Sequence, residues 1–326
     1  MKILVTGCAG FIGYHVAARL IKQNHEVIGI DNLNNYYDKK LKIYRLRKLS
    51  KISKKKNYKF FKIDICNKKK LKNLFKKYKF RKVLHFAAQA GIRFSLKRPD
   101  QYIRSNLLGF FNILSLSKEH NVLHFIYASS SSVYGSSKNI PFKEKNFTHH
   151  PLQLYAATKR SNELMAHSYS SLYKLPTTGL RFFTVYGPLG RPDMALYKFV
   201  KNIFLQRPIE IYNNGKHSRD FTYIDDAISA ILRASNKIPK KTTKFTNSDP
   251  SESNAPFRII NVGNSKTINL LDCIKLIEEI IGKKAIKKFM PIQKGDILKT
   301  HSDLKKIKNI LNYKANTDIE DGLKKF

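Results

Sequence analysis

A glycine-rich turn near the first residue separates an apolar strand from an amphipathic helical pattern. The segment MKILVTGCAGFIG contains three glycines at the spacing of a nucleotide-binding turn, Gly7, Gly10 and Gly13. In such a turn the first glycine permits the tight bend, the second lets the backbone approach a phosphate, and the third lets the helix close onto the strand. The helix at residues 11–23 begins with Phe11 and Ile12, and its N-terminus supplies N–H groups and a partial positive charge. The turn therefore predicts a site for the pyrophosphate of a nucleotide cofactor.

The next strand-like run, Glu26–Ile30, leads directly into an acidic residue, Asp31. It follows the glycines by roughly twenty residues, the spacing at which nucleotide-binding folds place a carboxylate on the ribose. Such a carboxylate accepts hydrogen bonds from a 2′-hydroxyl and repels a 2′-phosphate, and no arginine stands beside Asp31 and Asn32 in the sequence. These residues predict NAD rather than NADP. The alternative, an ordinary glycine-rich turn without a ligand, is disfavoured by the agreement of strand, glycines, helix and carboxylate.

Strand-like and helical patterns alternate through the first half of the chain. The strand-like runs lie at residues 3–5, 27–30, 58–63, 82–86, 124–128 and 177–182, and further helical patterns at residues 68–78, 102–119 and 155–173. This alternation is typical of a parallel, doubly wound sheet. We predict an α/β fold with a Rossmann domain in residues 1–180 and a smaller α/β substrate-binding domain in residues 181–326, interleaved with the first at the sheet edge. A polar stretch at residues 236–256 predicts a surface loop.

The composition disfavours several other classes of protein. The formal net charge is +39, but the lysines are spread through nearly every polar stretch, so no specific nucleic-acid partner is expected. The three cysteines are too few and too scattered for a metal site or a disulfide framework. No apolar run approaches the roughly eighteen residues of a membrane span, and no removable leader is recognisable. These features predict a cytoplasmic protein without a metal and without a membrane partner.

A tyrosine and a lysine lie four residues apart in the segment LYAATKRSNEL. A helix places Tyr155 and Lys159 on one face, where the ammonium group can stabilise a phenolate and lower the tyrosine pKa from about 10 toward neutrality. A run of serines at residues 129–132 follows a strand and offers a hydroxyl partner at the carboxyl end of the sheet. The Tyr-x-x-x-Lys pattern alone is unspecific. Together with the glycine turn and Asp31 it indicates an active site whose base is a tyrosine.

With these motifs the chain resembles the extended short-chain dehydrogenase/reductase family, and within it the UDP-glucuronate 4-epimerases. Besides the glycine turn, the resemblance includes the segments DNLNNYYDKKLK, HFAAQAGIRFS, SNLLGFFNIL, RFFTVYGPLGRPDMALYKF and GKHSRDFTYIDD. It implies an NAD-dependent isomerase that inverts C4 of a UDP-sugar through a 4-keto intermediate, converting UDP-glucuronate to UDP-galacturonate, with a place in polysaccharide biosynthesis. The chain departs from the family at Leu189, where tryptophan is usual, and at Lys294, where proline is usual.

The resemblance also implies roles for individual residues. Tyr155 is expected to be the base, Lys159 its electrostatic partner, and Ser130 the hydroxyl that polarises O4 of the sugar. Besides these and the glycine turn, the residues expected at the cofactor are Asp31, Asn32, Asp64, Ile65, Ala87, Ala88 and Asn106. The residues expected at the UDP-sugar are Arg93, Ser131, Ser132, Thr184, Arg191, Tyr212 and Arg219. The family often dimerises through helices corresponding to residues 102–119 and 155–173, so a homodimer is expected.

Plainer interpretations of four of these residues remain open. Asp64 and Asn106 are alternatively helix caps, and Tyr212 is alternatively a core residue. Arg219 is expected to bind the substrate diphosphate, and its alternative is a surface ion pair with Asp220. The diphosphate is favoured because it calls for bidentate donors, which a guanidinium group provides.

The serine run also distinguishes related reactions. Hexose 4,6-dehydratases carry an Asp-Glu pair after the hydroxyl residue, and UDP-glucuronate decarboxylases tend to place Glu in this turn, whereas this chain has Ser131 and Ser132. Serine cannot supply a general acid and base at neutral pH, so epimerisation is favoured. We hypothesise that both serines and Thr184 hold the sugar carboxylate and that Arg191 orients the ring. UDP-glucose and UDP-N-acetylglucosamine remain alternative substrates, and a non-catalytic sugar-nucleotide-binding protein remains an alternative class.

Overall fold

A seven-stranded parallel sheet forms the centre of the computed structural model, which describes residues 1–54, 56–243 and 249–326. The strand order is β10 (Phe257–Val262), β6 (Thr177–Phe182), β5 (His124–Ser130), β4 (Lys82–His85), β1 (Lys2–Thr6), β2 (Glu26–Asp31) and β3 (Tyr58–Lys62). Without β10, this is the strand order of a dinucleotide-binding Rossmann fold. The six strands predicted in the first half all lie in this sheet, and the predicted α/β fold is confirmed.

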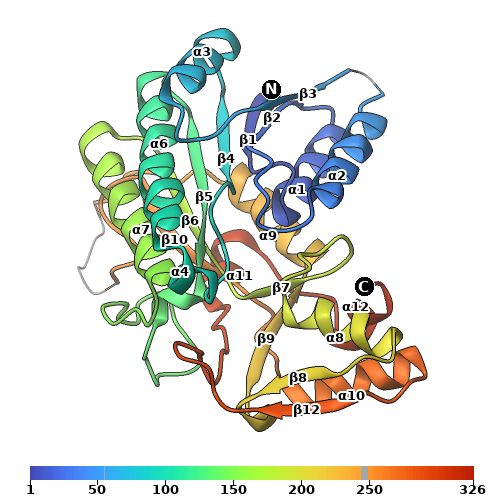
Figure 1. Cartoon of the computed structure of the whole chain (residues 1–326). Coiled ribbons are helices and arrows are strands. Elements are labelled where there is room, and N and C mark those ends of the chain that lie inside the picture. The colour runs from blue at the N-terminus through green and yellow to red at the C-terminus, as the bar shows by residue number, and fades with distance from the viewer. Residues whose placement is uncertain (55, 244–248) are drawn as a thin grey trace.

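Helices cover both faces of the sheet (Figure 1). On one face pack α3 (Lys68–Tyr78), α6 (Phe110–Glu119) and α7 (Leu154–Tyr173). On the other pack α2 (Lys39–Ile52), α1 (Phe11–Lys22) and α9 (Ile224–Asn236). The helix predicted at residues 102–119 consists of the end of α5 (Pro99–Tyr102), a wider π-helical stretch, η1 (Ile103–Gly109), and α6. Two further short elements flank the sheet edge, α4 (Phe94–Lys97) and η2 (Ser131–Tyr134).

Helix α2 is absent from the sequence-based prediction. Lysine and arginine dominate its sequence, KKLKIYRLRKLSKI, so it lacks the apolar period by which helices are usually recognised. Its buried residues are Lys42, Arg45 and Leu49, two of which carry charge. The helix begins after Asp38, whose carboxylate caps it by accepting a hydrogen bond from the backbone N–H of Lys40 at 2.8 Å.

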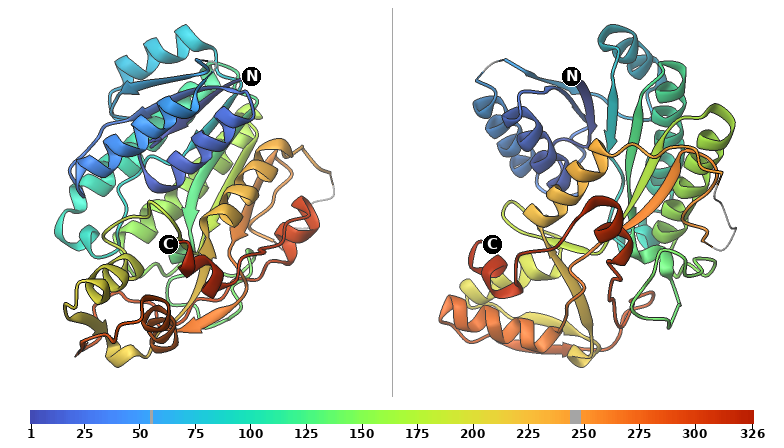
Figure 2. Two further views of the ribbon diagram at one scale, coloured as in Figure 1. Left: turned by 90° about the vertical axis from the view of Figure 1, so that its right-hand side faces the viewer. Right: turned by 180° about the vertical axis from the view of Figure 1, so that it is seen from behind.

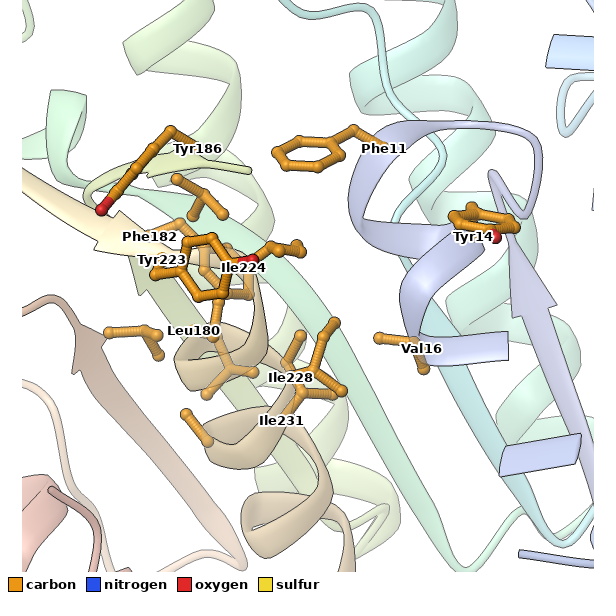
Figure 3. Packing of buried hydrophobic residues seen from close by; sticks show 14 of the residues in the cluster. Phe11, Tyr14, Val16, Leu180, Phe182, Tyr186, Tyr223, Ile224, Ile228 and Ile231 are labelled. Carbon is orange, nitrogen blue, oxygen red and sulfur yellow. The ribbon is translucent and has the colours of Figure 1, made fainter. Parts of the chain in front are cut away.

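The two halves of the chain share one hydrophobic core. Figure 3 shows Ile228 and Ile231 of α9 packed between Leu180 of β6 and Val16 of α1. Burying an isoleucine of this kind contributes about 1.5–3 kcal/mol. Both α9 and β10 lie beyond residue 180, but α9 packs on the Rossmann sheet and β10 is one of its strands. The chain therefore crosses more than once between the Rossmann part and the smaller lobe.

The rest of the second half forms a smaller α/β lobe at the carboxyl edge of the main sheet (Figure 2). It contains a three-stranded sheet of β11 (Thr267–Asn269), β9 (Ser218–Tyr223) and β7 (Thr184–Tyr186), and a two-stranded sheet of β12 (Lys287–Met290) and β8 (Ile209–Tyr212). Its helices are α8 (Ala195–Phe204), α10 (Leu270–Ile281) and α12 (Ile319–Lys324), with the short turn η3 (Asn213–Gly215) after β8. Helix α11 (Lys305–Leu311) instead packs beside β10 and α9. The division of the chain at residue 180 stays a prediction.

The polar stretch after α9 is irregular wherever the structure describes it. Residues 237–243 and 249–256 form no helix, and their only regular pairing is a single bridge between Glu252 and Arg258. Residues 244–248 of the predicted loop lie outside the described residues. Among the helices of the described ranges, none has both the length and the apolar character needed to cross a bilayer.

Candidate active site

One cavity lies at the carboxyl edge of the main sheet, where strand ends meet loops of the smaller lobe. Its lining contains many of the residues selected from the sequence: Gly7, Gly10, Phe11, Ile12, Gly13, Asp31, Asn32, Ile65, Ala87, Ala88, Ser130, Tyr155, Lys159 and Arg191. The fold therefore brings the glycine turn and the predicted Ser–Tyr–Lys set into a single cavity. This is the edge at which open α/β sheets bind their ligands.

The glycine turn has no room for side chains. A Cβ atom on Gly7, whose φ is +69°, would lie 2.8 Å from the backbone nitrogen of Ala87, and one on Gly13 would lie 2.1 Å from the carbonyl oxygen of Gly7. Helix α1 begins after Gly10, and no side chain caps it. Its first N–H groups are therefore available to an anionic ligand, which fits the pyrophosphate of a dinucleotide.

Asp31 lies at the end of β2, beside this turn. Its carboxylate accepts hydrogen bonds from the backbone N–H of Leu33 at 2.8 Å and of Ala9 at 3.3 Å. Burial raises the pKa of Asp31, and the ammonium group of Lys42, the two N–H groups and the guanidinium group of Arg45 oppose that rise. The expectation that no arginine stands beside Asp31 is thus wrong in three dimensions, because α2 brings Arg45 close. The Arg45 guanidinium group donates to four other oxygen atoms, so the carboxylate retains acceptor capacity for ribose hydroxyls.

Asp64 and Asn106 are not helix caps. Asp64 accepts hydrogen bonds from the backbone N–H of Cys66 at 2.8 Å and from the side-chain amide of Asn32 at 3.2 Å. Asn106, in the π-helical stretch η1, bonds both the N–H and the carbonyl of Gln89, at 2.8 and 3.0 Å. Asn32 and Gln89 line the cavity, so Asp64 and Asn106 orient its wall. Their direct contact with a cofactor stays a prediction.

Ser130 and Tyr155 meet at the carboxyl end of β5. The Ser130 hydroxyl donates a hydrogen bond to the Ser132 hydroxyl at 3.1 Å and accepts one from the backbone N–H of Ser132 at 3.2 Å. It lies close enough to Tyr155 to influence the pKa of that phenol. Burial raises the pKa of Tyr155, while the hydrogen bond from Ser130 and the positive charge of Arg191 lower it. Tyr155 is therefore a phenol in the wall of the cavity whose pKa is raised overall by burial, and Ser130 and Arg191 offset part of that rise.

Lys159 lies one helical turn after Tyr155 and is almost completely buried. Its ammonium group donates a hydrogen bond to the carbonyl of Ala128 at 2.9 Å. Burial lowers the pKa of Lys159 to about 8, so the group is mostly charged at neutral pH. A charged lysine on the same helix face as a phenol favours the phenolate, as the base assignment requires.

A buried charge network holds the start of the serine run. Ser129 donates to Glu163 at 2.6 Å, and Arg181 of β6 donates to both carboxylate oxygens of Glu163, at 2.8 and 2.9 Å. A further arginine, Arg160, donates to Glu163 at 2.9 Å. Sequence analysis missed this network. Its signal was the continued four-residue spacing of Tyr155, Lys159 and Glu163, which places all three on one face of α7.

Two of the predicted substrate residues pack together across the two parts of the chain: Arg93, directly before α4, and Tyr212, at the end of β8. The guanidinium group of Arg93 lies 4.5 Å from the centre of the Tyr212 ring and 3.6 Å from the Asp296 carboxylate. Tyr212 is only partly buried and donates its hydroxyl to Glu210 at 2.7 Å. The interpretation of Tyr212 as a core residue is therefore wrong.

Arg219 belongs to the same cluster. Burial lowers its pKa to about 10, Asp296 opposes this effect, and Arg93 adds to it. The alternative ion pair with Asp220 is wrong, because the Asp220 carboxylate accepts hydrogen bonds from Ser302 and from three backbone N–H groups instead. Arg93 and Arg219 thus lie close enough to influence each other, with a single carboxylate near both.

The residues predicted to hold a sugar carboxylate are only partly brought together. Arg191 lines the cavity and pairs with both oxygens of Asp193, at 3.0 and 2.6 Å. Ser131, Ser132 and Thr184 are not among the described residues that line the cavity. The two sequence neighbours of Thr184 do line it, and because side chains alternate along a strand, the Thr184 side chain points to the other face.

The cavity also contains residues that sequence analysis did not select. Four of them come from the loop after β2 and from the start of α2: Asn34, Tyr36, Tyr37 and Lys42. Tyr36 donates to Asp193 at 2.9 Å, which joins this loop to the smaller lobe. The signal lay in the segment DNLNNYYDKKLK, which supported the resemblance without any role being assigned to its tyrosines.

The fold and the cavity define a dinucleotide-binding protein in which the predicted Ser–Tyr–Lys set lines the same cavity as the glycine turn, and comparisons with known proteins agree. Residues 3–246 match the NAD dependent epimerase/dehydratase family. Protein CapI of Staphylococcus aureus is 48% identical over the whole chain and 97% of that protein. A probable UDP-glucuronate 4-epimerase of Rhizobium meliloti is 42% identical over the whole chain and 96% of that protein.

A solved structure is similar over the same length. UDP-glucuronic acid 4-epimerase from Bacillus cereus, in complex with UDP-glucuronic acid and NAD, is 34% identical, with a TM-score of 0.88, and the match covers 100% of this chain and 97% of that one. The chain belongs to the NAD-dependent epimerase/dehydratase family. The predicted family and the predicted cofactor, NAD, are confirmed. In such enzymes the bound NAD accepts a hydride from the sugar and returns it.

Proposed function

We propose that this protein is a UDP-glucuronate 4-epimerase that interconverts UDP-glucuronate and UDP-galacturonate. The observation that carries the proposal is the meeting of Ser130, Tyr155 and Arg191 in one cavity with the glycine turn. This set supplies a base, its hydroxyl partner and a cation suited to a uronate. The relatives with this activity in their names cover the whole chain and support the same substrate.

The chain's own residues account for the proton transfers of the reaction. The Tyr155 phenolate takes the proton of the C4 hydroxyl as the sugar is oxidised to the 4-keto form. The charge of Lys159 and the hydroxyl of Ser130 stabilise the phenolate before that step. After the keto sugar has turned over, Tyr155 returns the proton to O4 on the other face. No second acid or base is needed, which agrees with serines at positions 131 and 132.

A 4-keto uronate is a β-keto acid, which readily loses carbon dioxide unless its carboxylate is held. The Arg191 guanidinium group is fixed by its two hydrogen bonds to Asp193 and lies within electrostatic range of Tyr155. We assign Arg191 to orienting the sugar ring, and Ser131 and Ser132, which follow the cavity residue Ser130, to the carboxylate. Their contribution is positioning rather than acid catalysis. Thr184 is not assigned to the carboxylate, because its side chain points to the other face of β7.

The cluster of Arg93, Tyr212 and Arg219 suits the UDP part of the substrate. Arg93 and Arg219 provide two guanidinium groups for a diphosphate, and the exposed face of Tyr212 suits stacking near the uracil. Two buried polar atoms nearby, Nε2 of His217 and Oε1 of Gln293, have no hydrogen-bond partner within the protein. Buried polar atoms are normally paired, so these are available to a polar ligand.

An assay of the purified protein against three substrates tests the proposal. We expect turnover of UDP-glucuronate to UDP-galacturonate that exceeds turnover of UDP-glucose and UDP-N-acetylglucosamine. A preference for either neutral sugar would replace the proposed substrate with that alternative. Bound NAD without turnover of any of the three would favour a non-catalytic sugar-nucleotide-binding protein.

Replacing both Ser131 and Ser132 by alanine should impair epimerisation of UDP-glucuronate far more than any activity on UDP-glucose. A neutral C6 hydroxyl needs fewer donors, whereas each charge-assisted hydrogen bond lost from a carboxylate costs roughly 1.5–3 kcal/mol. The variant should also release UDP-pentose and carbon dioxide, because a loosely held carboxylate can align for departure. Mass spectrometry measures both products. If activity on both substrates falls equally and no UDP-pentose is formed, the carboxylate must be recognised by other residues, and Arg93 and Arg191 are the next candidates.

We also propose that the protein forms a homodimer through η1, α6 and α7. These elements expose large apolar side chains on one face of the sheet: Leu108, Phe111, Leu164 and Leu172. A large exposed apolar patch on a protein usually indicates a site of interaction with another molecule. Sedimentation at micromolar concentration measures the oligomeric state. The cytoplasmic location and the place in polysaccharide biosynthesis also remain proposals.

A further inference from the structure

A loop of the smaller lobe is fastened to the dinucleotide-binding part through its backbone. Three consecutive carbonyl groups, those of Pro188, Leu189 and Gly190, are bonded to side chains of the Rossmann part. His15 of α1 bonds the first at 3.0 Å, and Arg45 of α2 bonds the second at 2.6 Å and the third at 3.2 Å. Leu189 has a φ of +57°, a conformation that leucine rarely adopts, so this loop depends on its partners to hold its shape.

The same arginine also holds the glycine turn. Its Nη1 atom donates to the carbonyl of Ala9 at 2.8 Å and to the hydroxyl of Tyr37 at 2.7 Å. The Asp31 carboxylate accepts a hydrogen bond from the N–H of Ala9, so both backbone polar groups of Ala9 are hydrogen-bonded. The Arg45 side chain is completely buried. It therefore links the turn expected to hold the pyrophosphate with a loop from the other half of the chain.

A second connection lies along the same two segments. Tyr36 donates to Asp193, which is paired with Arg191. Tyr36 and Tyr37 from one segment and Arg191 and Met194 from the other all line the cavity. Both segments therefore form part of the wall around the cofactor site, and the guanidinium group of Arg45 and the ring of His15 hold them together.

We propose that Arg45, assisted by His15, is a positioning residue that latches the loop at residues 187–194 over the dinucleotide site and thereby keeps NAD(H) bound throughout the catalytic cycle. A 4-epimerase needs such retention, because the hydride taken from one face of the sugar must be returned to the other before the reduced cofactor leaves. This need rests on the proposed function. The latch rests on the contacts of Arg45 and His15.

The proposal predicts a cofactor that escapes when the latch is weakened. Arg45→Lys keeps the positive charge but cannot reach four oxygen atoms in two directions, because an ammonium group is a point donor and a guanidinium group is a fork. We expect NADH to dissociate from this variant at least roughly ten times faster than from the wild type, because charge-assisted hydrogen bonds are lost. The measurement is the decay of bound-NADH fluorescence after excess NAD is added, with no sugar present.

A matched control is available at Arg233 of α9. This arginine also donates to two consecutive carbonyl groups, those of Leu311 and Asn312 at 3.2 and 3.0 Å, but it is not among the residues that line the cavity. Arg233→Lys should release NADH at the wild-type rate, even if both variants lose thermal stability. Equal release rates in Arg45→Lys and the wild type, or an equal increase in both variants, would overturn the latch.

A milder variant keeps the proposal testable if Arg45→Lys does not fold. His15→Ala removes the donor to the Pro188 carbonyl from a partly exposed position, and we expect it to speed NADH release by roughly threefold or more, the effect of one ordinary hydrogen bond. Unchanged release from His15→Ala would count against the latch. Because these rates are measured without sugar, they stay informative even if the protein acts on another sugar nucleotide.

Discussion

Replacing Tyr155 by phenylalanine is expected to lower kcat by roughly a hundredfold to ten-thousandfold, the usual effect of removing a general base. The ring and its edge-on packing against Tyr102, at 6.2 Å between centres, are retained, so the affinity for the UDP-sugar should change little. Steady-state kinetics and a separate binding titration measure the two quantities. Tyr169→Phe, on the same helix but away from the cavity, is the matched control and should keep the wild-type kcat. A Tyr155→Phe variant with near-normal kcat would refute the assignment of the base.

The pH profile gives this prediction a second readout. Tyr155 must lose its proton to act as a base, and burial raises its pKa, so the wild-type rate should increase as the pH rises. The proposed role of Lys159, to stabilise the phenolate, requires a charged ammonium group, and burial lowers the pKa of Lys159 to about 8. The increase should therefore level off or reverse above about pH 8. The residual activity of Tyr155→Phe should lack the rising limb.

The strands of the first half could be predicted because both faces of a parallel sheet are buried. Their apolar runs are therefore nearly continuous, as in Val27–Ile30. β10 is also an apolar run, FRIINV, but it follows a long polar stretch and was assigned to the second domain. Its place beside β6 depends on a return of the chain that no local pattern records. Helix α2 was missed for the opposite reason, since it buries Lys42 and Arg45 where a helix usually buries apolar residues.

In the active site, too, some residues could be predicted from the sequence and others could not. The glycine turn, Asp31 and the Tyr155–Lys159 pair are local motifs whose chemistry depends on short spacings, and the structure places all of them at one cavity. The contacts of Arg45 with Leu189 and of Tyr36 with Asp193 join residues far apart in the chain. The acceptor of Arg45 is the backbone carbonyl of Leu189, a group that every residue carries, so no sequence pattern can indicate it. These contacts could be found only after the two lobes had been placed together.

Replacing Glu163 by glutamine is expected to destabilise the protein by about 3 kcal/mol or more, because it leaves the guanidinium group of Arg181 buried without its counter-charge. Glu163 and Arg181 are almost completely buried and are joined by two hydrogen bonds. Denaturant unfolding at neutral pH measures the loss. Glu320→Gln, which breaks the exposed pair with Lys324, is the control and should leave the stability nearly unchanged, because solvent screens such a pair. Similar losses in the two variants would show that the buried network contributes no more than a surface pair.

The effect of Glu163→Gln should depend on pH in a definite direction. Burial alone would raise the pKa of Glu163, but Arg181, Arg160 and the Ser129 hydroxyl lower it below the ordinary value of 4.5. A carboxyl with a lowered pKa stabilises the folded state above its unfolded pKa and loses that contribution as the pH falls through the folded one. The stability difference between wild type and variant should therefore be complete at pH 7 and shrink below about pH 4.5. A difference that stays constant into acid would mean that lost packing, rather than lost charge, causes the destabilisation.

The same variant connects the network to catalysis. Glu163 holds the hydroxyl of Ser129 at 2.6 Å, and Ser129 precedes the residue that contacts Tyr155. Glutamine offers Arg181 and Ser129 only a neutral oxygen, so the end of β5 should become less rigid and Ser130 less well placed. We expect kcat to fall several-fold in the folded variant while KM for the UDP-sugar changes little, because the partners of Glu163 are Ser129, Arg160 and Arg181, and not the proposed diphosphate residues Arg93 and Arg219. A higher KM at constant kcat would instead place the role of Glu163 in substrate binding.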